Sequence, residues 1–248
     1  MLLLASSVAP AEACAADFDL LSAVSAGTKA ISALTLSDKD VQEYVSQAVK
    51  YMDSENTVMP ESSDYTVRLR NLVSGITSVD GVPLNFKVYK TSDVNAFACA
   101  DGSVRIYTGT MDLMDDDELL GVIGHEIGHV GLHHSRKAMK NQLLTGALRD
   151  AIISTDGRVA TLAASQLGTL SEALVNAKYS RKQEEEADDY GYNFLKKNKK
   201  DPKSMIKALE KLQSLENGSV SGISKSMQQM FSTHPNTDKR IKRLRGKK

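Results

Sequence analysis

The stretch that decides the fold is His125-Glu126-Ile127-Gly128-His129, an HExxH motif. It follows the apolar run from Leu119 to Gly124, and no proline lies between Asp112 and Asn141, so we predict a helix from about Asp116 to Met139. Residues i and i+4 share one face of a helix, so both imidazoles can bind one zinc ion. Glu126 is rotated by about 100° from His125, which suits a general base.

A catalytic zinc site needs a third protein ligand and one open position. The longer motif HExxHxxGxxH would need glycine at position 132 and histidine at 135, where this chain has leucine and serine. His133 lies four residues beyond His129, but three ligands along one straight helix form a line and not a tetrahedron. His134 lies nine residues after His125, about half a turn from the metal face. We therefore predict that His133 and His134 contact a ligand from outside, cap a helix or lie on the surface.

An acidic, helix-forming segment from Ser180 to Gly191 offers a better third ligand. Glu184 and Asp188 are four residues apart, so they share a helix face. Glu184 can complete a His-His-Glu site, and Asp188 can accept the free N–H of a ligand imidazole and fix its tautomer. Without the HExxH motif, the same segment would be interpreted as a solvated helix face.

These motifs together resemble one family of peptidases. The pattern SRxxExxAD from Ser180 to Asp188 is similar to that of the membrane-associated gluzincin peptidases, which include HtpX, BepA and the CAAX prenyl protease. The stretches Asn95 to Phe97 and Asp101 to Gly109 resemble the strand pair that precedes the zinc helix in that family. Ser232-Thr233-His234-Pro235 resembles its THP segment. The likeness covers the chain from about Leu36 to its end.

The resemblance implies a zinc endopeptidase whose metal ligands are His125, His129 and Glu184. It implies that Glu126 is the base that assists the attack of zinc-bound water, and that Asp188 is the outer partner of a ligand histidine. In some relatives the histidine before proline blocks the water position, so His234 is a candidate gate or transition-state residue. From the residues alone, His234 is equally a helix-boundary residue before proline.

Two further roles depend on the surroundings of the zinc ion. The oxyanion of the transition state needs a donor besides zinc, and the candidates are His234, Tyr179 and Arg240. Substrate would bind most simply as an added strand along Asn95, Ala96 and Phe97, because backbone hydrogen bonds do not demand a particular sequence. The side chain of Asn95 can hold a peptide group, or Asn95 can simply be the turn residue ahead of a strand.

Composition narrows the classes of protein. The 248 residues are 41% hydrophobic with a formal net charge of zero, so the chain can bury one core and nothing points to nucleic acid. No apolar stretch reaches the length of a membrane-spanning helix. From Lys239 to Lys248 seven residues in ten are basic, which is typical of a solvated helix end and also allows peripheral contact with an anionic membrane.

The N-terminus resembles the remnant of a secretory signal over residues 1–13, although no positive charge precedes its apolar stretch. We expect a linker over residues 14–35 and a single zinc metallopeptidase domain over residues 36–248. Cys14 follows the cleavage pattern Ala11-Glu12-Ala13, which favours the periplasm and allows an outer-membrane lipid anchor, although a lipidation signal prefers leucine where Ala11 stands. A Cys14–Cys99 disulfide is allowed in an oxidising compartment but is not implied by two cysteines.

The predicted fold class is α+β and predominantly α-helical, a zincin-like metallopeptidase domain with a small β-sheet beside the HExxH helix. Alternating hydrophobicity predicts strands near Leu84 to Val88, Val94 to Ala98 and Val104 to Thr108. Apolar spacing and capping residues predict further helices near 37–52, 63–74, 143–153, 158–176, 178–198, 202–216 and 236–246.

Two functional classes follow. The first is a zinc endopeptidase that acts on unfolded or misassembled cell-envelope proteins, with outer-membrane or envelope assembly factors as further partners. The second is a binding or chaperone module whose zinc site stays closed, for example through His234. A purely structural helical protein would require the motifs to be accidental.

Overall fold

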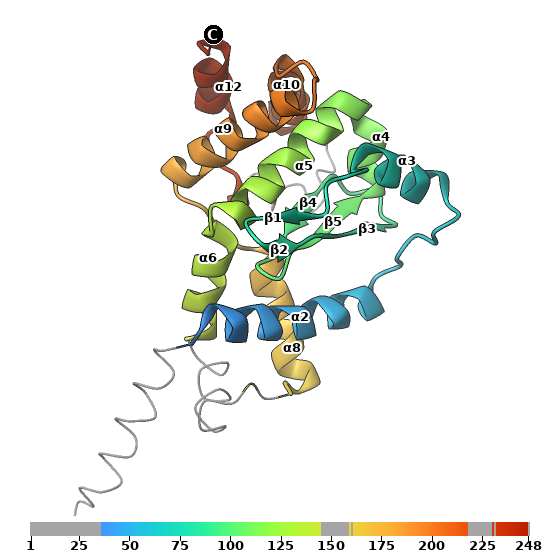
Figure 1. The fold of residues 1–248 in the computed structure, drawn as a ribbon, viewed down its shortest axis with the longest axis vertical. Coiled ribbons are helices and arrows are strands. Elements are labelled where there is room, and N and C mark those ends of the chain that lie inside the picture. The colour runs from blue at the N-terminus through green and yellow to red at the C-terminus, as the bar shows by residue number, and fades with distance from the viewer. Residues whose placement is uncertain (1–35, 145–158, 160, 218–229, 231, 248) are drawn as a thin grey trace, which may run out of the picture.

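The computed structural model describes residues 36–144, 159, 161–217, 230 and 232–247. Over these residues the chain is mainly helical with two small sheets (Figure 1), so the predicted fold class is confirmed. The helices are α2 (Asp38–Glu55), α3 (Asp64–Leu72), α4 (Thr108–Leu113), α5 (Asp116–Gly131), α6 (His134–Leu143), α8 (Ala164–Val175), α9 (Arg181–Lys197), α10 (Lys203–Asn217) and α12 (Thr237–Arg245). The strands are β1 (Ser78–Val79), β2 (Val82–Pro83), β3 (Asn85–Tyr89), β4 (Ala96–Ala98) and β5 (Ser103–Tyr107).

Helix α5 runs through the centre of the molecule and packs against both α9 and β4 (Figure 1). Asp115 begins the helix with a capping box, because its side chain accepts from the N–H of Glu118 while the Glu118 carboxylate accepts from the N–H of Asp115. Every residue from Glu118 to Val130 except Val122 is buried. The HExxH motif therefore lies inside the protein.

The predicted helix from Asp116 to Met139 was wrong in its length, because the structure divides it into α5 and α6. His133 has a φ of 61°, in the left-handed region. A left-handed residue cannot continue a right-handed helix, so the chain turns there and resumes as α6 at His134. The break changes the direction in which His134 points.

The larger sheet has the strand order β3-β5-β4. β3 pairs with β5 in parallel, with Asn85 opposite Ser103. β4 pairs with β5 in antiparallel fashion, with Ala96 opposite Ile106. All three predicted strands are present, and β4 forms the edge that packs on α5.

Some elements differ from the expected ones. The short hairpin of β1 and β2 was not predicted, and it turns at Asp80 and Gly81, which both have positive φ. Helix α4 after β5 was also not predicted. The predicted helices 158–176 and 178–198 begin later, at Ala164 and Arg181, the second because the Ser180 side chain caps α9. Most of the predicted helix 143–153 lies outside the described residues.

Residues 1–35 also lie outside the described residues. The expected signal remnant, linker, Cys14 anchor and Cys14–Cys99 disulfide therefore stay predictions. Cys99 itself is buried, and burial raises the pKa of its thiol well above the ordinary value. Of the helices that the structure describes, none combines the length and the hydropathy needed to cross a membrane.

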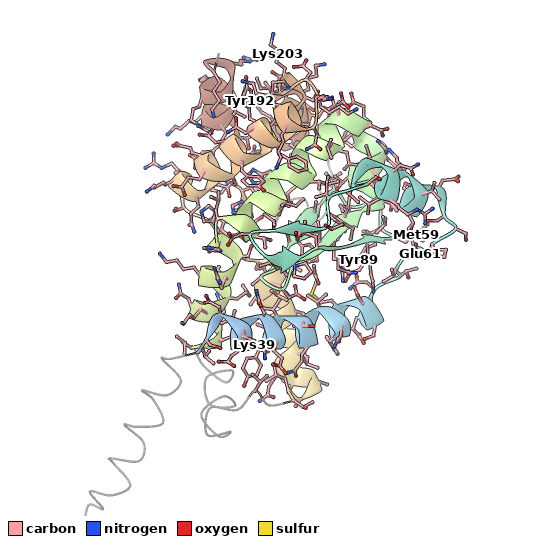
Figure 2. All side chains as sticks on the ribbon, in the orientation of Figure 1. Lys39, Met59, Glu61, Tyr89, Tyr192 and Lys203 are labelled. Atoms are coloured by element: carbon pink, nitrogen blue, oxygen red, sulfur yellow. The ribbon has the colours of Figure 1, made fainter. Side chains whose placement is uncertain are left out.

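A buried ion pair fastens the larger sheet to α2. Arg105 on β5 is 2% exposed and donates to both carboxylate oxygens of Asp53 on α2, at 2.8 and 3.0 Å. Tyr89, labelled in Figure 2, and Lys87 donate to the same carboxylate at 2.7 and 2.8 Å. Burial raises the pKa of Asp53, but these hydrogen bonds outweigh it and hold the pKa below its ordinary value. The three-stranded sheet, which packs on α5 through β4, is thus also attached to α2.

Glycine allows α9 to approach α5 closely. A Cβ at Gly191 on α9 would lie 3.1 Å from the backbone nitrogen of His125 and 3.2 Å from the carbonyl oxygen of Gly121. Because both neighbours are backbone atoms of α5, they cannot rotate away as a side chain could. The close approach brings Glu184 of α9 next to His125 and His129.

Candidate metal centre

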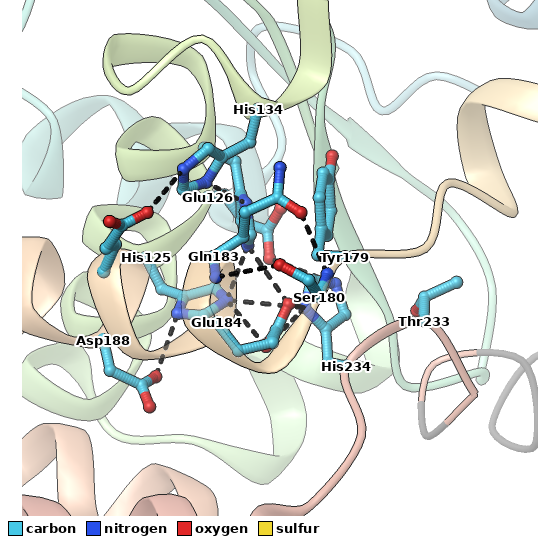
Figure 3. A network of polar contacts seen from close by, with 12 residues as sticks. His125, Glu126, His134, Tyr179, Ser180, Gln183, Glu184, Asp188, Thr233 and His234 are labelled. Carbon is cyan, nitrogen blue, oxygen red and sulfur yellow. Dashed lines mark hydrogen bonds and ion pairs between the residues drawn. The ribbon is translucent and has the colours of Figure 1, made fainter. Parts of the chain in front are cut away.

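Four side chains with metal-donor atoms, from three separate parts of the chain, meet beside α5. His125 and His129 come from α5, Glu184 from the first turn of α9, and His234 from the segment before α12. Figure 3 shows His125, Glu184 and His234 lying close together. One donor atom of each residue lies within 4.8 Å of those of the other three. The structure therefore brings together the three predicted ligands and the predicted gate residue.

The spacing of the donor atoms fits a four-coordinate metal. Nε2 of His125 lies 3.1 Å from Nε2 of His129. The carboxylate oxygens of Glu184 lie 3.5 Å from Nε2 of His129 and 3.7 Å from Nε2 of His125. Nδ1 of His234 lies 3.4 Å from Nε2 of His125 and 3.1 Å from Oε1 of Glu184. Ligand atoms held at about 2.0–2.1 Å around a tetrahedral metal are about 3.3 Å apart.

The protons of the two α5 histidines point away from the cluster. Nδ1 of His125 lies 3.1 Å from Oδ1 of Asp188, so that nitrogen carries the proton and Nε2 presents a lone pair. Nδ1 of His129 lies 3.1 Å from Nδ1 of His134, on the side away from the cluster, and burial lowers the pKa of His129 well below its ordinary value, which favours the neutral ring. Two imidazole lone pairs and a carboxylate then face one another, an arrangement that a cation stabilises. The residues present therefore fit a metal ion by their chemistry as well as by their spacing.

Glu126 lies beside this group but is not one of its four members. The side chain points toward His234, whose Nε2 is 3.8 Å from Oε1 of Glu126. Burial raises the pKa of Glu126, and the nearby His234 only partly opposes that effect. A carboxylate with a raised pKa is a stronger base, as general-base catalysis near neutral pH requires.

Arg240 of α12 binds the carboxylates that α9 carries into the centre. Its Nε and Nη2 donate to Asp188 at 2.9 and 2.6 Å, and its Nη1 lies 2.9 Å from Oε2 of Glu184. Burial raises the pKa of Asp188, but the charge and hydrogen bonds of Arg240 and His125 together outweigh burial and hold that pKa far below the ordinary value. Arg240 was expected as an oxyanion donor, but in the structure its guanidinium group binds the carboxylates of Asp188 and Glu184.

Tyr179, another candidate oxyanion donor, stacks on the ring of His129 with the ring centroids 3.8 Å apart. Its hydroxyl lies 3.3 Å from Oγ of Ser135, and Ser135 donates to the carbonyl of Ala98 on β4. Tyr179 therefore packs His129 in place. His234 is the candidate whose ring nitrogen lies near Glu126.

The expected substrate-binding residues Asn95, Ala96 and Phe97 are buried at the edge of the sheet. The backbone of Asn95 already bonds within the protein, since its N–H donates to Thr110 Oγ1 at 2.7 Å and its carbonyl accepts from the N–H of Tyr107. An added strand would therefore have to bond along Ala96 to Ala98, and not at Asn95.

Two cavities border this edge. One is lined by residues that include Phe97, Glu126, Tyr179 and His234. The other reaches from Ala96 past Glu126 and is mainly apolar, with Val122, Met205 and Leu209 among its walls. The candidate base therefore faces both cavities.

The two histidines after the motif have different surroundings. His133 is exposed, and its Nε2 lies 3.2 Å from a carboxylate oxygen of Asp80. His134 is buried, with Nδ1 3.1 Å from Nδ1 of His129 and Nε2 3.2 Å from Oε2 of Glu186. Of the expected alternatives, His133 takes the surface position and His134 contacts a candidate ligand from outside.

An HExxH helix joined by a glutamate from a later helix defines the class of metal-dependent peptidases. Comparison with known proteins places the chain within that class. Residues 68–248 match peptidase family M48. The chain is 43% identical over 224 residues to the metalloprotease YcaL of Escherichia coli (strain K12), covering 90% of this chain and 85% of YcaL. It is 42% identical over 245 residues to the metalloprotease LoiP of the same strain, covering 98% and 94% of the two chains. The chain therefore belongs to peptidase family M48.

More distant matches were also found. The β-barrel assembly-enhancing protease of Escherichia coli (strain K12) is 30% identical over 151 residues, which are 57% of this chain and 30% of that protein. The solved structure of S. mikatae Ste24p is 17% identical with a TM-score of 0.44, covering 90% of this chain and 63% of Ste24p.

Proposed function

We propose that this protein is a zinc-dependent endopeptidase that cleaves unfolded or misassembled proteins of the cell envelope. The observation that supports it most directly is the convergence of His125, His129 and Glu184 at tetrahedral spacing beside Glu126. Two imidazoles and one carboxylate form the His-His-Glu ligand set of a gluzincin, and nitrogen and oxygen donors in this geometry suit zinc.

The proposed mechanism assigns the proton transfers to Glu126. Zinc would act as a Lewis acid that polarises the peptide carbonyl and lowers the pKa of water. Glu126 would accept the proton of the attacking water and deliver it to the leaving amine. Asp188, held by Arg240, would keep the ring of His125 oriented with Nε2 toward the metal.

The position of His234 bears on whether the site is open. Its Nδ1 takes the fourth donor position, 3.1 Å from Glu184 and 3.4 Å from His125, where catalysis requires water. We propose that this closed arrangement is a resting state, and that movement of His234 admits water and lets its ring assist the oxyanion. A permanently closed site would instead favour the alternative function, a binding or chaperone module.

The cavities beside β4 support a peptide substrate. A strand added along Ala96 to Ala98 would pass Glu126, and the mainly apolar cavity beside it could accept a side chain next to the cleaved bond. Methionine, leucine and valine make up six of its thirteen lining residues, and most of its exposed lining surface is apolar, so an apolar side chain would fit best. Apolar side chains are accessible mainly in unfolded chains, which supports unfolded proteins as the substrate class.

We also propose a periplasmic location, with an outer-membrane anchor at Cys14. Support comes from the signal-like residues 1–13 and from the relatedness to a protease named for enhancing β-barrel assembly. The proposed partners are misassembled envelope proteins and their assembly factors, with peripheral membrane contact through the basic residues near Arg245.

The test is cleavage of casein by the full chain with and without a chelator, together with elemental analysis. We expect chelation to stop cleavage, and Glu126→Gln to abolish it while zinc stays near one per chain. Glu172→Gln, the same change at an exposed position of α8, should cleave like the wild type. Wild-type rates in Glu126→Gln would refute the mechanism, and zinc binding without any wild-type cleavage would favour the binding module.

A further inference from the structure

We propose that His134 and Glu186 form a positioning pair that holds His129 with its Nε2 presented to the metal. The proposal rests on the zinc site proposed above and adds two residues to it. His134, labelled in Figure 3, lies behind His129 at the start of α6, and Glu186 reaches His134 from α9. The pair therefore joins the HExxH helix, α6 and α9 behind one ligand.

The contacts of His134 determine the protons along this chain of groups. Nε2 of His134 lies 3.2 Å from the carboxylate of Glu186, which can only accept, so Nε2 carries the proton. Nδ1 of the neutral His134 ring is then an acceptor, and it lies 3.1 Å from Nδ1 of His129. Nδ1 of His129 must therefore donate, which leaves Nε2 of His129 as the lone pair that faces His125 and Glu184.

The break between α5 and α6 makes this contact possible. On a continuous helix, His134 would be rotated by about 140° from His129, five residues earlier. The left-handed conformation of His133 interrupts the helix, and His134 then lies in the interior, where it is 6% exposed. The hydroxyl of Ser135 bonds to Ala98 of β4, which fixes the first turn of α6.

The two α5 histidines are thus supported by different chemistry. His125 donates to the carboxylate of Asp188, whose charge Arg240 balances. His129 donates to the neutral imidazole of His134, so this contact places no negative charge directly beside the ligand. The carboxylate of Glu186 is separated from His129 by the ring of His134. A hydrogen bond from outside orients a ligand ring and raises its basicity.

The test measures zinc affinity of the full chain by competition with a chromogenic chelator. We expect His134→Phe to weaken zinc binding by about 10- to 100-fold, the range for removal of an outer partner of a ligand. His134→Asn should recover most of the affinity, because its Oδ1 can accept from His129. Glu186→Gln should cause a smaller loss, since an amide oxygen can still accept from Nε2 of His134. Unchanged zinc affinity in His134→Phe would overturn the proposal.

A matched control is His133→Asn, because asparagine tolerates the left-handed conformation and His133 is exposed. We expect this variant to bind zinc like the wild type. If it lost as much zinc affinity as His134→Phe, the cause would be the turn between α5 and α6 and not the contact of His134 with His129.

Thermal unfolding of the metal-free proteins separates a folding defect from a positioning role. If His134 positions His129, a tenfold loss of zinc affinity lowers the free energy by which zinc stabilises the fold by about 1.4 kcal/mol. That loss is measured in addition to any change in the stability of the metal-free protein. A wild type that binds no zinc would refute the proposed function, whereas a wild type that binds zinc with unaltered His134 variants would refute this inference alone.

Discussion

Replacing Gly191 with alanine tests whether the close contact of α9 with α5 positions the metal ligands. The new Cβ would lie 3.1 Å from the backbone nitrogen of His125 and 3.2 Å from the carbonyl oxygen of Gly121. Ordinary carbon contacts begin at about 3.5 Å, so α9 would have to move away by about 0.4 Å. That movement separates the helix that carries Glu184 from the backbone of His125.

The change in stability expected for Gly191→Ala follows from two opposing effects. Alanine stabilises a helix interior by about 1 kcal/mol relative to glycine, whereas overpacking a tight contact costs about 1–3 kcal/mol. Gly168→Ala on α8 isolates the first effect, because a Cβ at Gly168 would have nothing within 4 Å. We therefore expect Gly191→Ala to be about 1–3 kcal/mol less stable than Gly168→Ala.

The assay compares thermal unfolding of both variants in the metal-free state and then their zinc retention during dialysis. A difference of 1–3 kcal/mol corresponds to about 2–12 °C in Tm for a domain of this size. We expect Gly191→Ala to lose zinc faster as well, since Glu184 and His125 move apart. Equal stabilisation by the two alanines would refute the close packing, and a Tm loss with unchanged zinc retention would show that this packing does not position the ligands.

Three other outcomes are expected. Glu184→Ala should lose most of its zinc on dialysis by elemental analysis, whereas Glu185→Ala, an exposed neighbour, should keep it; normal zinc content in Glu184→Ala would contradict the ligand assignment. His234→Ala should cleave casein faster than the wild type because the fourth donor position opens, and slower cleavage would indicate transition-state assistance instead. Asp53→Asn should cost about 3 kcal/mol near neutral pH by urea denaturation, because it leaves buried Arg105 unpaired. The pKa of Asp53 is lowered in the folded protein, so its contribution is present above about pH 4 and is lost as the pH falls further; a difference between variant and wild type that did not shrink below about pH 4 would exclude that carboxylate.

The parts of the site that could be predicted from sequence are those set within a single helix. The spacing of His125 and His129 fixes a shared face, and so does the spacing of Glu184 and Asp188, because each helical residue turns by about 100°. The acidic segment could therefore be matched to the HExxH motif without knowing how α9 packs on α5.

The parts that could not be predicted depend on contacts between distant segments. Arg240 was a candidate oxyanion donor, but nothing in the sequence indicates that it binds Asp188, and that role appears only when α12 packs beside Asp188. The inward position of His134 depends on a left-handed histidine, and histidine is no strong signal for that conformation. The turn at Asp80-Gly81 is different, because that dipeptide is itself a hairpin signal and could have been recognised.

Charge explains why the ligand cluster and the fold depend on each other. Around the centre, the described residues include three buried carboxylates, Glu126, Glu184 and Asp188, and one buried guanidinium, Arg240. Burial lowers the pKa of His234, but the neighbouring carboxylates of Glu184 and Glu126 together outweigh burial and raise it overall. The three carboxylates outnumber the guanidinium by two, and unbalanced buried charge is costly. A divalent cation at the centre would balance both negative charges, which links metal binding to the packing of α9 and α12 around the cluster.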